Sequence, residues 1–296
     1  MLGIAPLFES PKYMARSANG NLVLKFSGLS LGGIMQTGKL LSGAEMQWER
    51  LQRLAGKGLT PAPLASIEGW IALPWIEGRN LTPGDATEPI LRHVAGYIRL
   101  AAEAPLEAPE AHGAYSRLRS LLCTNSRHLL GEEAGVRADR LSDALMSDIE
   151  HLDFASCGDG RLAPHEWVDT GDRILKLDAA GHARDHTAIG AQTMLWDVAG
   201  AAVDWELPHA TARDLAQFSG ARGVSGNVIS YYCAAYAAYR AGLLHYCIAG
   251  CGSIDERHAL TTAQRIYTER LRSELQRMDT FLPVRTYIQA SPRYAT

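Results

Sequence analysis

Apolar residues change their spacing along this chain, and the change limits the folds that it can adopt. About the first hundred residues carry short strand-like runs, whereas about the last ninety repeat their apolar residues mostly at helical spacing. Strands gathered in one part and helices in another predict an α+β protein. At 296 residues, the chain is long enough for one large domain or for two smaller lobes.

The strand-rich part contains a predicted hairpin followed by a predicted helix. In "KYMARSANGNLVLKF", which begins at Lys12, two strand-like runs flank Asn19-Gly20, the strongest short-range turn signal. Further on, "GAEMQWERLQRLAG" places its apolar residues on one helical face and is followed by a second glycine. Another apolar run, "WIALPWIEGRNL", is strand-like and ends in a turn. These elements indicate a small strand-rich unit with one amphipathic helix.

The later part of the chain is predicted to be mostly helical. Its longest uncharged apolar stretch runs from Val228 to Tyr239 and is interrupted by Arg240, at about half of the length that a bilayer requires. We therefore predict a buried helix there and no membrane partner. The N-terminus has no basic segment followed by an apolar run, so we expect no secretory signal.

Composition and charge exclude several classes of partner. The chain is 47% hydrophobic and 21% charged, with a formal charge of −3, as in an ordinary soluble globular protein. Without a basic block there is no electrostatic reason to expect nucleic acid, so a small molecule is the expected partner. Five cysteines without paired spacing favour neither a disulfide framework nor a zinc site, and a reducing cytoplasm is the expected location.

The order of the predicted elements resembles that of a two-lobed kinase. In such enzymes the third strand presents a lysine to the nucleotide phosphates, and an acid on the next helix holds that lysine. Lys25 in "NLVLKF" takes the position of the lysine. Glu45 lies nearer the apolar face of the following helix than Glu49, so it is the preferred partner of Lys25. Both acids could instead be solvated helix charges.

Two aspartates in the later part carry the resemblance further. Gly158-Asp159 in "SCGDGRLAPHEWV" and Asp178 in "RILKLDAAGH" are separated by two strand-like runs. This pattern resembles the aminoglycoside phosphotransferase and choline kinase family, whose loop reads His-Gly-Asp-x-x-x-x-Asn and whose metal-binding aspartate closes the following strand. The resemblance implies that Asp159 orients the acceptor hydroxyl and accepts its proton, that Asp178 holds Mg²⁺, and that Lys25 binds the phosphates of ATP.

The same resemblance implies an organisation for the whole chain. An N-terminal nucleotide-binding lobe is expected over residues 1–78, and a helical C-terminal lobe with the catalytic loop over residues 79–296. Asp197 in "WDVAGAAVDW" resembles the family's structural aspartate, which steadies the catalytic loop. The segment "LPWIEGRNL" takes the position of the hinge between lobes, which implies that the nucleotide contacts Pro74, Trp75, Ile76 and Glu77.

The catalytic loop departs from the family pattern at two positions. Cys157 stands where the family usually has histidine, and Pro164 stands where it has the metal-binding asparagine. Glu166, two positions later, would supply an oxygen ligand to Mg²⁺ if the loop carries a two-residue insertion. The glycine loop that covers the nucleotide is also hard to find, because only eleven residues precede the first predicted strand.

A different phosphate-binding motif lies in "GLSLGGIMQTGKLLSG". Gly33, Gly38 and Lys39 satisfy the GxxxxGK pattern of a P-loop between a strand-like run and a helix. The motif should continue with Ser or Thr, yet position 40 is Leu, and the chain then turns helical instead of alternating strands and helices. A glycine-rich connector is the preferred interpretation.

Two hypotheses about function follow. The first is an ATP- and magnesium-dependent phosphotransferase acting on a small hydroxylated or amine-bearing molecule. The second is a kinase-like binding or scaffold protein that has lost turnover, as the absent asparagine and the weak glycine loop suggest. Retention of Lys25, Asp159 and Asp178 together favours the enzyme. The helices that choose the acceptor vary within such a fold, so its identity is left open.

Overall fold

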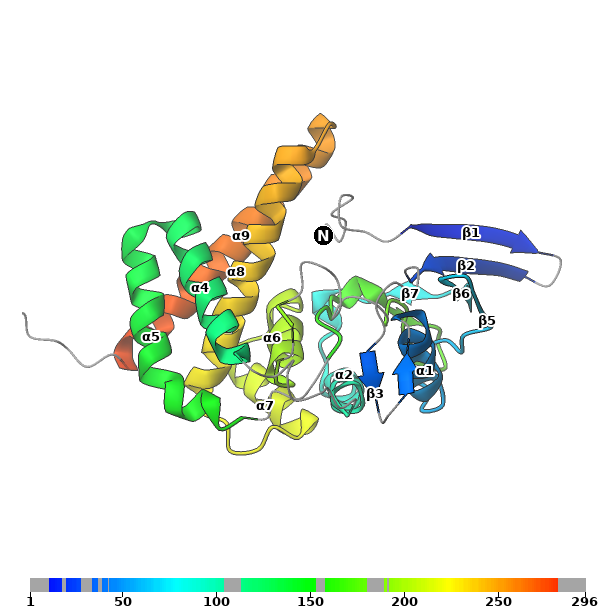
Figure 1. Ribbon diagram of the computed structural model, residues 1–296, viewed down its shortest axis with the longest axis horizontal. Coiled ribbons are helices and arrows are strands. Elements are labelled where there is room, and N and C mark those ends of the chain that lie inside the picture. Colours follow the sequence, from blue (N-terminus) through cyan, green and yellow to red (C-terminus); the bar gives the residue numbers. More distant parts are fainter. Residues whose placement is uncertain are drawn as a thin grey trace, which may run out of the picture.

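The computed structural model places a sheet at one end of the molecule and a group of long helices at the other (Figure 1). None of the helices in the described ranges has the length and hydropathy that crossing a membrane requires. The structure describes residues 11–17, 20–27, 34–36, 39–41, 43–103, 113–152, 158–179, 189–190 and 192–281.

The N-terminal sheet has four antiparallel strands in the order β1-β2-β6-β5. The predicted hairpin is confirmed, because β1 and β2 pair in a register that places Lys12 opposite Lys25 and Ser17 opposite Gly20. Gly20 has a φ of 119°, a backbone conformation that favours glycine. The strands are β1 (Lys12–Ser17), β2 (Gly20–Phe26), β5 (Ala65–Ile67) and β6 (Trp70–Pro74).

The segment between β2 and the first helix contains a second hairpin. Strands β3 (Ile34–Gln36) and β4 (Lys39–Leu41) pair with each other, and Gln36 lies opposite Lys39. A P-loop would instead wrap as one continuous loop from a strand into a helix, so this geometry excludes the P-loop interpretation. The predicted amphipathic helix follows as α1 (Gly43–Ala55), which buries Leu51 and Leu54 in the core.

A short sheet joins the two regions of the molecule. The chain leaves β6 at Pro74 and enters β7 (Arg79–Asn80), which pairs with β8 (Trp167–Asp169), and β8 pairs with β9 (Ile174–Lys176). Gly78 is needed at this junction, because a Cβ there would lie 2.5 Å from the Asp169 carbonyl oxygen and closer still to Val168 Cγ1. A boundary between lobes at residue 78 stays a prediction.

The C-terminal region is a layered group of helices that shares one main core with α1 and the sheet. Helix α8 packs along α9, and α4, α6 and α7 pack against α8. The predicted buried helix is confirmed in α8, since the stretch 228–239 is almost wholly buried. The helices are α2 (Glu88–Ala102), α4 (Ala114–Leu130), α5 (Glu132–Glu150), α6 (Leu195–Asp204), α7 (His209–Ser219), α8 (Gly226–Gly250) and α9 (Ile254–Met278), with 3-10 turns at Pro83–Asp85, Pro164–Glu166 and Asp279–Phe281.

Candidate nucleotide-binding and catalytic site

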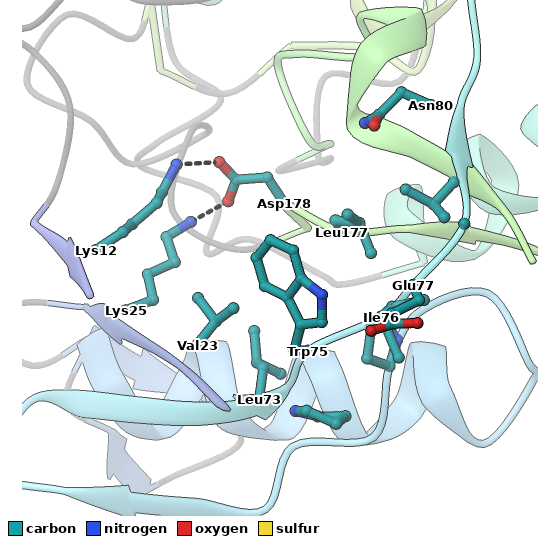
Figure 2. Close-up of a pocket in the computed structure, with 14 residues that line it drawn as sticks. Lys12, Val23, Lys25, Leu73, Trp75, Ile76, Glu77, Asn80, Leu177 and Asp178 are labelled. Carbon is teal, nitrogen blue, oxygen red and sulfur yellow. Dashed lines mark hydrogen bonds and ion pairs between the residues drawn. The ribbon is translucent and has the colours of Figure 1, made fainter. Parts of the chain in front are cut away.

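A cavity of about 450 Å³ lies between the N-terminal sheet, the junction segment after β6 and the turn after β9 (Figure 2). This volume falls in the range of small-molecule pockets. Residues predicted to bind a nucleotide line it together: Lys25, Pro74, Trp75, Ile76 and Glu77. The predicted metal ligand Asp178 lines it as well. The structure thus brings together residues that are far apart in the sequence.

The walls of this cavity are largely apolar. Val23 of β2 and Leu73 of β6 come from adjacent paired strands and lie opposite each other in the sheet register. Val168 of β8 and Leu177 just after β9 supply apolar side chains from the short joining sheet. Two apolar layers contributed by different sheets suit a flat ring, and the main chain of the junction segment offers hydrogen-bonding groups beside them.

Charged groups gather at one side of the cavity. The buried Lys25 Nζ donates to Asp178 Oδ1, and Lys12 Nζ donates to Asp178 Oδ2 at 2.7 Å. Figure 2 shows both lysines reaching the carboxylate from the sheet, while Ile76 and Glu77 lie on the other side. The carboxylate is the group here that could hold Mg²⁺, which is usually bound by one or two carboxylates together with substrate phosphates. Both Asp178 oxygens contact lysines, so a metal ion would have to replace one of these contacts.

Asp159 is held in a buried network of polar side chains. The residue is 2% exposed, and the Tyr97 hydroxyl donates to Asp159 Oδ2. Burial and the charge of Asp159 raise the pKa of Tyr97, so the phenol keeps the proton that it donates. Arg50 Nη2 lies 3.9 Å and Lys176 Nζ 3.8 Å from the same carboxylate oxygen. These cations stabilise Asp159 in its ionised form.

The main chain around Asp159 is fixed by Asp197, as the family resemblance implied for a structural aspartate. The amides of Asp159 and Gly160 donate to Asp197 Oδ2 and Oδ1 at 2.7 and 2.8 Å. A Cβ at Gly158 would overlap the Asp197 carboxylate, which explains a glycine at that position. Burial and the negative charge of Asp159 raise the pKa of Asp197 to about 6.

Glu166 and Asp159 both lie near the ammonium group of Lys176. Lys176 Nζ donates to Glu166 Oε2 at 2.7 Å and to the Asp178 carbonyl oxygen at 2.5 Å, and Arg161 Nε lies 2.8 Å from Glu166 Oε1. Burial lowers the pKa of Lys176, but the charges of Asp159, Glu166 and Asp178 outweigh it and raise that pKa, so the lysine stays charged. Both Glu166 oxygens therefore contact cations of the protein, and a metal ion would have to replace one of them.

The structure connects α1 to the site through a residue that the sequence did not single out. Arg50 Nε donates to the Ala179 carbonyl at 3.1 Å, beside Asp178, in addition to approaching Asp159. Glu45 and Glu49 both have exposed side chains on the same helix. Pairing of Glu45 with Lys25 therefore stays a prediction. Cys157, at the usual histidine position of the loop, lies outside the described residues.

Lys12, Lys176 and Tyr97 were also missed in the sequence. The hairpin register was a signal for Lys12. A residue directly opposite Lys25 projects from the same face of the sheet, so the register could have placed Lys12 beside Lys25. Lys176 precedes Asp178 in a short strand, but nothing local indicates that it is fully buried. Tyr97 carries no signal beyond helical periodicity. In the described ranges, no three His, Cys, Asp or Glu side chains form a metal-binding group.

The architecture is a kinase-like fold, with an N-terminal antiparallel sheet, a joining segment and a helical C-terminal region around two short strands. It is the fold of the choline kinases and aminoglycoside phosphotransferases, which confirms the fold predicted from the sequence. No protein-family model matches the sequence, and no curated protein matches it.

Three solved structures illustrate the likeness. The choline kinase LicA from Streptococcus pneumoniae has a TM-score of 0.57 and 14% identity, covering 91% of this chain and 96% of that chain. A choline/ethanolamine kinase family protein from Mesorhizobium loti has a TM-score of 0.55 and 14% identity, covering 94% and 92%. The spectinomycin phosphotransferase APH(9)-Ia, in complex with ADP and spectinomycin, has a TM-score of 0.54 and 12% identity, covering 90% of each chain.

Proposed function

We propose that this protein transfers a phosphoryl group from ATP to a small hydroxylated or amine-bearing molecule. The strongest support is the contact between Lys25 and Asp178, two residues far apart in the sequence. Both line an apolar cavity, which is bounded by the segment that joins the sheet to the helices. Neighbours of the same fold have been solved in complex with AMP and with ADP. The cavity therefore suits the nucleotide.

In this proposal the adenine ring lies between the apolar layers of Val23 and Leu73 on one side and Leu177 on the other. The junction segment, with Pro74, Trp75, Ile76 and Glu77, bounds the ring, and Lys25 binds the phosphates. Mg²⁺ held by Asp178 would neutralise part of the phosphate charge. Glu166 as a second ligand stays a prediction, since its oxygens contact Lys176 and Arg161.

Asp159 is the proposed base. It accepts the proton of the acceptor hydroxyl while the acceptor oxygen bonds to the γ-phosphorus and the bond from that phosphorus to the departing ADP oxygen breaks. Asp159 forms no covalent bond to the substrate in this scheme. Its main chain is fixed by Asp197, so its carboxylate can hold the acceptor hydroxyl in position for transfer.

Transfer of labelled phosphate from ATP to a panel of amino alcohols and aminoglycosides tests the proposal. We expect incorporation by the wild type and a fall of about a hundredfold or more for Asp159→Asn, the scale expected when a positioned base is removed. ATP affinity should stay within a few fold, because the cavity residues are untouched. Asp148→Asn, on the exposed face of α5, is the matched control and should retain full transfer.

One observation favours the alternative of a binding protein without turnover. Asp159 is almost wholly buried and its carboxylate already accepts from Tyr97. If the wild type binds ATP yet shows neither transfer nor hydrolysis above the level of Asp159→Asn across the panel, the binding protein replaces the phosphotransferase.

A further inference from the structure

Two lysines lie directly opposite each other in the hairpin of β1 and β2. Lys12 and Lys25 are register partners, and both side chains line the cavity. Like charges directly opposite on neighbouring strands destabilise a sheet. A pair of this kind therefore requires an anionic group between the two ammonium groups, and in this structure the Asp178 carboxylate is that group.

Asp178 contacts both members of this pair. Its Oδ1 accepts from Lys25 and its Oδ2 accepts from Lys12, so each carboxylate oxygen contacts a different lysine (Figure 2). The Lys12 side chain is 37% exposed, whereas that of Lys25 is 8% exposed. Lys12 can therefore follow an incoming ligand with little rearrangement, since its long stem is partly in solvent.

A polyphosphate can replace the Asp178 carboxylate as the partner of the two lysines, because it also presents negatively charged oxygens that accept hydrogen bonds. Successive phosphate groups carry several oxygens and more negative charge than one carboxylate, and lysine binds phosphate as a compact charge. Moving the ammonium groups from Asp178 to phosphates would also release both Asp178 oxygens. When phosphate is bound by the two lysines, the Asp178 carboxylate is therefore available to hold the metal ion.

We propose that Lys12 is a second phosphate-binding lysine, which acts with Lys25 to recognise the polyphosphate part of the nucleotide and exchanges Asp178 for phosphate when the nucleotide binds. The inference rests on the proposed nucleotide site and adds a residue and an exchange of partners to it. It requires that Lys12 contributes to affinity for ATP and not to affinity for the nucleoside.

Calorimetric titration of Lys12→Met with ATP and with adenosine, both in the presence of Mg²⁺, tests the proposal. We expect ATP affinity to fall by about tenfold or more, the value of a hydrogen bond between charged groups. Adenosine affinity should stay within about twofold, and Lys12→Arg should retain most of the ATP affinity because it keeps the charge. Lys57→Met, which removes an exposed lysine just after α1, is the matched control.

The outcomes separate this inference from the proposed function. If the wild type binds ATP and Lys12→Met binds it as tightly as Lys57→Met does, the inference is wrong while the nucleotide site stands. An equal loss of ATP and adenosine affinity in Lys12→Met also overturns it, because the lysine would then support the cavity and not the phosphates. If the wild type does not bind ATP, both the proposed function and the inference fail.

Discussion

Replacement of Lys176 by methionine should destabilise this protein strongly. The ammonium is fully buried, lies 2.7 Å from Glu166 Oε2 and 3.8 Å from Asp159 Oδ2, and donates to the Asp178 carbonyl. Methionine has a similar length, so the change removes charge with little change in packing volume. Glu166 and Asp159 would then have one cation fewer in a region that excludes water.

The expected cost follows from this geometry. Breaking a buried ion pair by removing one partner costs about 3–5 kcal/mol, because the remaining charge stays buried. With an unfolding entropy of about 2.1 cal/mol/K per residue, one kcal/mol shifts the melting temperature of a chain of 296 residues by about 1.6 °C. We therefore expect a fall of about 5–8 °C for Lys176→Met. Lys57→Met, at an exposed position, should change the free energy of unfolding by less than about 0.5 kcal/mol.

Chemical denaturation of a double-mutant cycle measures the interaction itself. Glu166→Gln removes the charge that Lys176 contacts most closely, so the double variant should be more stable than the sum of the two single changes predicts. The reasoning is refuted if Lys176→Met lies within about 1 kcal/mol of the wild type, or if the two changes are additive within about 0.3 kcal/mol. Either result would mean that the Lys176 ammonium does not offset the buried negative charge of Glu166 and Asp159.

Two other predictions concern backbone packing and pH. Gly78→Ala should cost about 1–3 kcal/mol by denaturation, since its Cβ would overlap Val168, while Gly84→Ala, whose Cβ would meet Thr82 Oγ1 at 3.6 Å, should cost little; equal costs would contradict this. Because burial and Asp159 raise the pKa of Asp197 to about 6, the folded state binds a proton that the unfolded state releases above about pH 4. The free energy of unfolding should therefore fall by up to about 3 kcal/mol from pH 4 to 6, and Asp197→Asn should remove this slope; an unchanged slope would be contrary to the assignment.

Local signals predicted the elements of the fold well. The Asn19-Gly20 turn located the first hairpin, and the apolar face of α1 and the uncharged stretch within α8 each matched an observed helix. The hairpin of β3 and β4 was missed because each strand has only three residues, too few for a period to be read. There the glycine pattern suggested a connector or a P-loop instead.

The site could be predicted only in part, because much of it depends on contacts between distant segments. Lys25 and Asp178 stand at recognisable positions in motifs, and the structure brings them together. Arg50 and Tyr97 reach Asp159 from different helices, and no spacing in the sequence indicates that they meet there. The role of Lys176 between Glu166 and Asp159 was not predicted either. In the sequence Lys176 resembles an ordinary solvated strand residue, and only the structure shows that it is buried.

The central claim is that this cavity binds a nucleotide together with a metal at Asp178. Calorimetric titration of ATP with and without Mg²⁺, on the wild type and on Asp178→Asn, tests it most directly. We expect Mg²⁺ to strengthen ATP binding to the wild type by about tenfold or more, and Asp178→Asn to lose that dependence while still binding the metal-free nucleotide. Absence of ATP binding to the wild type, or the same Mg²⁺ dependence in both proteins, would contradict the account.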